Sequence, residues 1–234
     1  MTSVAPPDVA RPVPRGYFVT GTDTGVGKTR IAVALIHALR AQGLRVAGMK
    51  PVSAGQAPGE RNEDVVALMQ ASNVAADLRD VNPYAFEPAI APHIAAAQAG
   101  VRIDLDVIRA AHARLAAQAD AVVVEGAGGW RVPLNEREDL ADLAQALGAP
   151  VVLVVGLRLG CLSHALLTAE SVARRGLPWG GWVGNAIDPA MDCRRENIES
   201  LMIRLPGPCL GILSYQPDSA PGAWLPETHG LTDS

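Results

Sequence analysis

The chain has 234 residues, of which 49% are hydrophobic and 19% are charged, and its formal net charge is −4 at pH 7. This apolar content is enough for a large core and excludes an intrinsically disordered chain. The acidic balance leaves no basic footprint, which excludes nucleic acid or an acidic membrane surface as an expected partner.

The two ends of the chain differ in composition from the rest. Residues 1–15 are rich in proline and lack the apolar core of a secretory signal, so we expect a disordered leader. Residues 216–234 hold further prolines and glycines and are expected to form an irregular tail. Between them, residues 16–215 are predicted to form a single α/β domain. Three separated cysteines, with no C-x-x-C pair, indicate reduced thiols in a cytoplasmic protein.

The most informative stretch is a glycine-rich loop at residues 21–29, with the sequence GTDTGVGKT. It follows an apolar run at residues 17–20 and opens into a helical pattern at residues 30–39, which is the strand-loop-helix context of a phosphate-binding loop. Lys28 supplies a cation and Thr29 can offer its hydroxyl to Mg²⁺. One extra residue separates the first glycine from the Gly-Lys-Thr end, so this is a variant of the usual pattern.

Strand-like and helix-like segments alternate along the rest of the chain. Residues 81–92, with three prolines, are expected to be irregular. Further strands are predicted at residues 44–49, 121–124, 151–155, 181–183 and 209–213, and further helices at residues 63–70, 105–115, 139–147, 162–174 and 192–203. This alternation predicts a P-loop NTPase-like α/β fold, with a mostly parallel sheet and helices on both faces.

Ligands of such sheets bind at the carboxyl ends of the strands, so the residues that follow each strand should converge. Glu125 ends an apolar strand where P-loop proteins place a carboxylate for the metal. Lys50 follows the strand expected beside the loop strand and could neutralise charge beyond the γ-phosphate, although an ordinary exposed lysine is the alternative. Asp64 alone is more typical of a helix-start carboxylate. Asn185 begins an N-x-x-D string that could read either guanine or adenine.

Several strings in chain order resemble the dethiobiotin synthetase family, and together they span most of residues 17–213. The strings are residues 21–29, 50–52, 81–84, 92–94, 124–130, 154–156, 159–161 and 181–183. This family closes the ureido ring of dethiobiotin from 7,8-diaminopelargonic acid, CO₂ and ATP with Mg²⁺, a late step of biotin biosynthesis. The resemblance therefore implies an ATP-dependent ligase that acts as a cytoplasmic homodimer.

The resemblance also implies roles for single residues. Catalytic roles fall on Thr24, Lys28 and Lys50. Contacts to ATP fall on Gly25, Val26, Gly27, Lys28, Thr29, Arg30, Asp64, Glu125, Gly126, Ala127, Gly128, Asn185 and Ser214. Contacts to the diamine substrate fall on Thr24, Lys50, Ser53, Ala54, Cys161, Leu162 and Ser163, the last three reaching the substrate tail across the dimer interface. The Mg²⁺ ligands would be Thr29, Asp64 and Glu125.

The chain departs from the family at a few positions. Ala54 stands where many members have a hydroxyl that contacts the substrate, and Ser53 lies one residue earlier. Ser214 stands where a proline is often found, near the expected nucleotide pocket. Two other kinds of protein have a similar loop: the ATPase part of a cobyrinic acid amide synthase, and a nucleotide switch of the partitioning type. The first normally carries a glutaminase domain, and the second an additional lysine near the first glycines.

Overall fold

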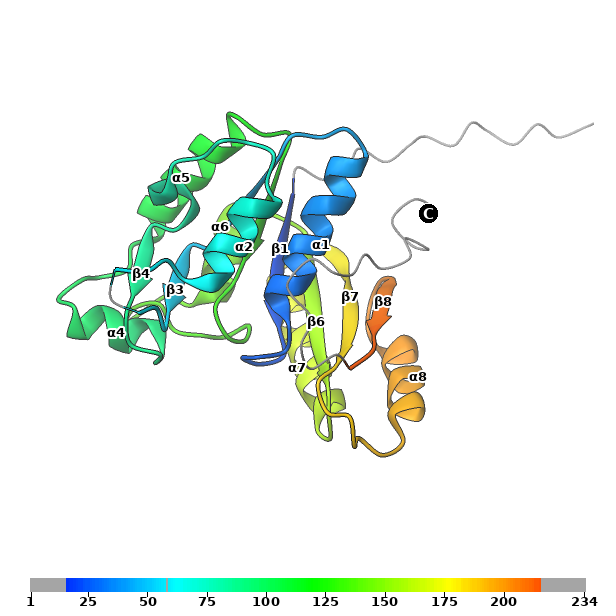
Figure 1. Ribbon diagram of the computed structural model, residues 1–234. Coiled ribbons are helices and arrows are strands. Elements are labelled where there is room, and N and C mark those ends of the chain that lie inside the picture. The colour runs from blue at the N-terminus through cyan, green and yellow to red at the C-terminus, as the bar shows by residue number, and fades with distance from the viewer. Residues whose placement is uncertain (1–15, 58, 216–234) are drawn as a thin grey trace, which may run out of the picture.

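The computed structural model describes residues 16–57 and 59–215, so the leader and tail predicted above lie outside the described residues. A six-stranded sheet with the order β2-β5-β1-β6-β7-β8 runs through the molecule (Figure 1), and every pair of neighbouring strands in it is parallel. Its strands are β1 (Gly16–Gly21), β2 (Val46–Met49), β5 (Ala121–Glu125), β6 (Val151–Leu157), β7 (Trp179–Ala186) and β8 (Cys209–Leu213). The predicted parallel α/β sheet is confirmed.

Helices cover both faces of this sheet, as predicted. Successive residues of a strand point to opposite faces, and β6 shows the two layers directly. Val152 and Val154 pack in one cluster with Ile31 of helix α1, whereas Leu153 and Val155 pack in another with α7 and α8. The first face carries α1 (Lys28–Ala41) and α2 (Glu63–Ala71), and the second carries α5 (Leu105–Ala116), α6 (Leu140–Leu147), α7 (Cys161–Arg174) and α8 (Arg194–Arg204).

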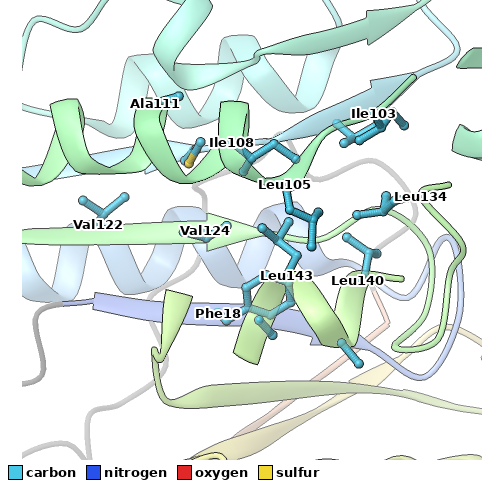
Figure 2. Close-up of a cluster of buried hydrophobic side chains, with 14 of the residues drawn as sticks. Phe18, Ile103, Leu105, Ile108, Ala111, Val122, Val124, Leu134, Leu140 and Leu143 are labelled. Carbon is cyan, nitrogen blue, oxygen red and sulfur yellow. The ribbon is translucent and has the colours of Figure 1, made fainter. Parts of the chain in front are cut away.

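The largest part of the core lies between β1, β5 and the helices α5 and α6. Figure 2 shows Phe18 of β1 and Val124 of β5 facing Leu143 and Leu140 of α6, with Ile108 of α5 above them. All five side chains are buried. Burial of an aliphatic or phenyl side chain contributes about 1.5–3 kcal/mol to folding, so this layer fixes the strands whose carboxyl ends carry the functional residues.

A second, two-stranded parallel sheet was not predicted. It pairs β3 (Val52–Ala54) with β4 (Tyr84–Phe86), and it is flanked by α3 (Leu78–Val81) and α4 (Pro92–Gln98). The prediction of irregular structure at residues 81–92 is therefore wrong over β4 and over the start of α4. The prolines do mark breaks between elements, but the three-residue strands are stabilised by pairing across about thirty residues, which no local pattern reveals.

Element ends also shift from the prediction by a few residues. The helix expected from residue 139 begins at Leu140, because Asp139 is its N-cap and accepts hydrogen bonds from the backbone N–H groups of Ala141 and Asp142. The strand expected at residues 181–183 extends over all of β7. Within residues 16–57 and 59–215, no helix is both long and apolar enough to cross a membrane.

Candidate active site

A cavity of about 740 Å³ opens at the carboxyl edge of the main sheet. The loop after β1, Lys50 after β2 and Glu125 at the end of β5 meet there, as parallel strands require. The lining residues are Thr24, Gly25, Gly27, Lys28, Thr29, Lys50, Ser53, Ala54, Asn62, Asp64, Ala89, Ile90, Ala91, Pro92, Glu125, Ala127, Gly128 and Val132. Most of them belong to the set predicted from the sequence.

The glycine-rich loop leads from β1 into the N-terminus of α1. Gly25 and Gly27 have φ angles of 73° and 91°, a region that glycine adopts without strain. A Cβ atom on Gly27 would lie only 2.4 Å from Nδ2 of Asn185, so the loop packs closely on β7. Lys28 follows, and its ammonium donates to the carbonyl of Asp23 at 2.9 Å. The backbone N–H groups of this turn and of the helix start are suited to an anion.

Four polar side chains form a cluster beside this loop, in which Lys50 and Glu125 are buried and Thr29 and Asp64 are partly exposed. The ammonium nitrogen of Lys50 lies 2.5 Å from Glu125 Oε1 and 2.7 Å from Asp64 Oδ2. The hydroxyl of Thr29 lies 2.6 Å from Asp64 Oδ1 and 2.9 Å from Glu125 Oε1. The side chains of Lys50 and Glu125 are 5% and 1% exposed, so the ordinary exposed lysine considered for Lys50 is excluded.

Burial and charge shift the pKa values of this cluster in different directions. Burial lowers the pKa of Lys28 to about 8, and the nearby ammonium of Lys50 adds to the effect. Burial would lower the pKa of Lys50 too, but the carboxylates of Glu125 and Asp64 outweigh it and hold that pKa above its usual value. Complete burial raises the pKa of Glu125 against the opposing charge of Lys50. For Asp64, Lys50 outweighs burial, and its pKa is lowered.

The predicted metal ligands lie together but do not form a closed metal centre. No group of three or more His, Cys, Asp or Glu side chains among the described residues is arranged to hold an ion. Thr29, Asp64 and Glu125 instead offer only oxygen atoms, which is the donor set that Mg²⁺ prefers when substrate phosphates and water complete its shell. Glu125 Oε2 is buried without a hydrogen-bond partner, so one oxygen remains available to a cation. The three residues fit Mg²⁺.

Lys28 and Lys50 are the only two lysines in the chain, which carries 18 arginines among its 20 basic residues. Both lysines are buried and both line the cavity. An arginine at the surface is always charged, whereas a buried lysine shifts its pKa readily and can approach a phosphate as a compact point charge. The two lysine side chains of the chain are therefore both found at this site, and every other Lys or Arg position is an arginine.

The predicted substrate residues are divided between the cavity and its surroundings. Thr24 is exposed at the cavity, opposite Gly128, and Ala54 lines the wall without a hydroxyl. Ser53 is buried, and its hydroxyl donates to Asn82 Oδ1 at 3.0 Å. Ser53 therefore uses its hydroxyl within the fold and does not stand in for the one that position 54 lacks.

Other predicted residues are not among those that line the cavity. Asn185 donates to the carbonyl of Val26 at 2.9 Å, which anchors it against the loop. Ser214 is exposed just after β8. Cys161, Leu162 and Ser163 form the first turn of α7, outside the lining residues of the cavity. Arg30, Gly126 and Val26 lie within the loop-helix and strand-end segments that support the lining residues.

The residues predicted from the sequence leave out three parts of the cavity lining: residues 89–92, Asn62 and Val132. Residues 89–92 form a largely apolar wall opposite the loop, and nothing in their local pattern relates them to a strand end. Asn62 both lines the cavity and caps α2, where its Oδ1 accepts from the N–H of Asp64 at 3.1 Å. Because an asparagine one or two residues before a helical pattern is an N-cap signal, Asn62 could have been found, and it explains how Asp64 is aimed.

The chain is similar to known proteins in sequence and in fold. A family model described as an AAA domain, AAA_26, matches residues 15–223. The ATP-dependent dethiobiotin synthetase BioD of Nitrosospira multiformis is 57% identical over 201 residues, covering 86% of this chain and 88% of the relative. The protein of the same name from Aromatoleum aromaticum is 54% identical and covers 86% and 91%. Among solved structures, the cell division protein MinD of Aquifex aeolicus in complex with MinC matches with a TM-score of 0.54 at 18% identity, covering 87% of this chain and 82% of that one. This likeness concerns the fold alone.

Proposed function

Because the chain belongs to the ATP-dependent dethiobiotin synthetase family, we propose that it closes the ureido ring of dethiobiotin from 7,8-diaminopelargonic acid, CO₂ and ATP. It is accordingly an ATP-dependent ligase of biotin biosynthesis. One observation from the fold supports this reaction most directly. A second buried lysine, Lys50, lies near the phosphate-binding lysine and contacts the carboxylates of Asp64 and Glu125. Phosphoryl transfer to a second anion needs such an additional cation.

The reaction needs positioning and charge neutralisation more than covalent chemistry by the protein. One amine of the diamine captures CO₂ as a carbamate and releases a proton. A carbamate oxygen then attacks the γ-phosphorus of ATP, ADP leaves, and a mixed carbamic-phosphoric anhydride remains. The second amine attacks the anhydride carbonyl, phosphate leaves, the amine loses a proton, and the five-membered urea is closed.

The two lysines bind different anionic groups in this reaction. Lys28, at the start of α1, binds the β- and γ-phosphates together with the backbone N–H groups of the loop. Lys50 and Thr29 both donate to Glu125 Oε1. From this place the ammonium of Lys50 binds the carbamate and the phosphoryl group in transfer. Thr24, exposed at the cavity and next to Gly128, contacts the diamine.

Thr29, Asp64 and Glu125 would hold Mg²⁺ together with phosphate oxygens. Bound there, the ion would neutralise part of the phosphate charge. In the free protein the carboxylates of Asp64 and Glu125 are bonded to the ammonium of Lys50. Lys50 therefore leaves at least one of its carboxylate contacts when it turns toward the carbamate.

We also propose that the protein acts as a cytoplasmic homodimer built on the single domain of residues 16–215. Support comes from α7, whose first turn carries three predicted substrate residues but lies outside the cavity of its own chain. Leu159, 92% exposed, and Leu167, 62% exposed, leave apolar surface at and along this helix. Sedimentation of the purified protein should give twice the mass of one chain, and a Leu167→Glu change should shift it toward the monomer.

The nucleotide-switch reading is weaker than the ligase reading. The MinD likeness is at 18% identity and so concerns the fold, and no lysine stands near the first glycines of the loop. A ligase that transfers a phosphoryl group to a second anion uses an additional cation, and the buried ammonium of Lys50 supplies one. The similarity to a cobyrinic acid amide synthase receives no support from relatives that are 57% and 54% identical, because both are dethiobiotin synthetases.

A direct assay tests the proposal. Purified protein is incubated with Mg-ATP and bicarbonate, with and without 7,8-diaminopelargonic acid, while phosphate release and product mass are followed together. Phosphate that appears only with the diamine, matched by one cyclic urea per phosphate, is the expected result. Phosphate release that is indifferent to the diamine would reject the ligase and favour the switch.

A further inference from the structure

Asn82 lies in the string Val81-Asn82-Pro83-Tyr84, to which the reaction itself assigns no role. The residue ends α3, where its backbone N–H donates to the carbonyl of Leu78 at 2.7 Å, and its side chain is buried. Its amide nitrogen donates to the carbonyl of Lys50 at 2.6 Å and to the carbonyl of Tyr84 at 3.1 Å. Its amide oxygen accepts from the hydroxyl of Ser53 at 3.0 Å.

These contacts hold the backbone of Lys50 on both sides. The Lys50 N–H donates to the carbonyl of Val81 at 2.8 Å, and the Lys50 carbonyl accepts from the amide of Asn82. Pro51 follows and has no N–H group to donate. The carbonyl of Pro51 accepts a hydrogen bond from the N–H of Tyr84 at 3.2 Å, which also ties this segment to β4. Lys50 thus sits at the junction of the two sheets with both of its backbone groups bonded to residues 81–82.

We propose that Asn82 is a positioning residue for the ring-closing reaction, fixing the backbone of Lys50 so that its ammonium reaches the transferring phosphoryl group. This inference rests on the proposed function. Asn82 is not among the residues that line the cavity, so it acts through the lining residue Lys50 to which it is bonded. A displacement of about 1 Å at a catalytic group can lower a rate by about a hundredfold. Because the lysine side chain is long and flexible, the position of the Lys50 backbone affects the position of its ammonium.

The chemistry of the site explains why the residue is an asparagine. A primary amide has two donors and one acceptor oxygen, and here both donors meet carbonyls while the oxygen meets a hydroxyl. An aspartate has the same shape but no donor, and it would set a carboxylate against two carbonyl oxygens. An alanine would leave the Lys50 carbonyl and the Ser53 hydroxyl without these partners in a buried place.

The chain offers a matched control in Asn73. Its side chain also joins backbone segments, since its Oδ1 accepts from the N–H of Val46 at 2.7 Å and its Nδ2 donates to the carbonyl of Leu44 at 3.0 Å. It does so at the amino end of β2, whereas Asn82 acts just beyond the carboxyl end of the same strand. Asn73→Ala and Asn82→Ala therefore both remove an amide bridge, but only the second releases Lys50.

The test measures turnover and nucleotide affinity in the full-length protein. For Asn82→Ala we expect kcat to fall by about 10- to 100-fold with the Kd of ATP within about twofold of wild type, because the phosphate loop is untouched. Asn73→Ala should keep kcat within about twofold. A kcat for Asn82→Ala that equals wild type, or an equal loss in both variants, overturns the inference. A wild-type protein inactive on 7,8-diaminopelargonic acid would instead reject the proposed function.

A second readout follows Lys50 itself. With ¹³C-labelled lysine the protein gives only two lysine side-chain signals, which a Lys50→Arg variant assigns. The Lys50 signal should shift in Asn82→Ala and stay in place in Asn73→Ala, with Lys28 unchanged in both. If Asn82→Ala does not fold, Asn82→Asp replaces it, with Asn73→Asp as its control: the first removes the donors to the carbonyls of Lys50 and Tyr84 and must lower kcat, whereas the second removes the donor to the carbonyl of Leu44 and must keep kcat within about threefold. The opposite order contradicts the proposal.

Discussion

The ammonium of Lys50 lies 2.5 Å from Glu125 Oε1, and both side chains are almost completely buried. The pair joins the end of β2 to the end of β5 across neighbouring strands of the sheet. A charge held this way is neutralised in the free protein by carboxylates that would also bind Mg²⁺. Lys50 can turn to a substrate anion only when another cation takes its place, so the metal and this lysine should compete.

Replacement of Lys50 by methionine should remove turnover while leaving nucleotide binding in place. Loss of one preorganised positive group at a developing anion lowers kcat by about 10²- to 10³-fold, whereas the phosphate loop keeps its own lysine. Ring closure followed by product mass, with ATP affinity measured by calorimetry, checks both parts. Arg45→Met, at an exposed ion pair with Asp120 before β2, is the control. Unchanged turnover in Lys50→Met would remove Lys50 from the mechanism.

The same Lys50→Met variant should bind a free divalent cation more tightly than the wild type. Without the ammonium, no side-chain cation competes with the metal for Asp64 and Glu125, and one unit charge at this range changes affinity by at least about tenfold. Titration with Mn²⁺ in the absence of nucleotide, followed by electron paramagnetic resonance, measures this. Equal affinity in the two proteins would show that Lys50 does not occupy the place of the metal.

Nucleotide binding should take up protons at mildly alkaline pH. Burial lowers the pKa of Lys28 to about 8, from an ordinary value of 10.5, so the free protein loses this proton as the pH rises through 8. Bound phosphates favour the charged form and raise that pKa. At pH 8.5 about three-quarters of a proton should be taken up per ATP, against about a tenth at pH 7. Calorimetry in two buffers of different ionisation enthalpy measures the uptake, and equal values at both pH values contradict the prediction.

The lowered pKa of Lys28 also determines how its contribution to the free energy of unfolding changes with pH. Above pH 8 the folded protein has released the Lys28 proton, whereas the unfolded chain keeps it up to about 10.5. The unfolded state therefore binds more protons in that window, and the contribution of Lys28 to the free energy of unfolding should rise with pH between 8 and 10.5. Urea unfolding of the wild type and of Lys28→Met across this window isolates the contribution of Lys28 as the difference between the two slopes.

Two glycines of the loop should respond differently to alanine. Both have positive φ angles, so alanine strains each by about 1 kcal/mol. At Gly27 the new Cβ would also lie 2.4 Å from Asn185 Nδ2, whereas at Gly25 nothing lies within 4 Å. Gly27→Ala should weaken ATP binding by at least about tenfold, and Gly25→Ala by less than about fivefold. Equal losses would mean that packing on β7 does not shape the loop.

Much of the site could be predicted from the sequence because short runs of adjacent residues identify its parts. The glycine-rich loop, the Lys50-Pro51 break and Glu125 at the end of a continuous apolar run each combine a structural cue with a chemical group in adjacent residues. The topology of parallel sheets then brings strand ends together without further information. For the same reason Lys28, Lys50, Thr29 and Glu125 were expected in one place, and all four line the cavity.

The tertiary structure alone decided what depends on pairing between distant segments. β3 and β4 are three residues each and gain their stability from each other, so prolines near them indicated loop where strands formed. The tether from Asn82 to Lys50 spans 32 positions, and the apolar wall at residues 89–92 faces a loop more than sixty residues earlier. The periodicity of a segment indicates which of its faces packs against the core. The contacts above instead join two segments that are distant in the sequence. The entropic cost of closing the loop between them depends only weakly on its length, so the local sequence does not indicate which segments will pair.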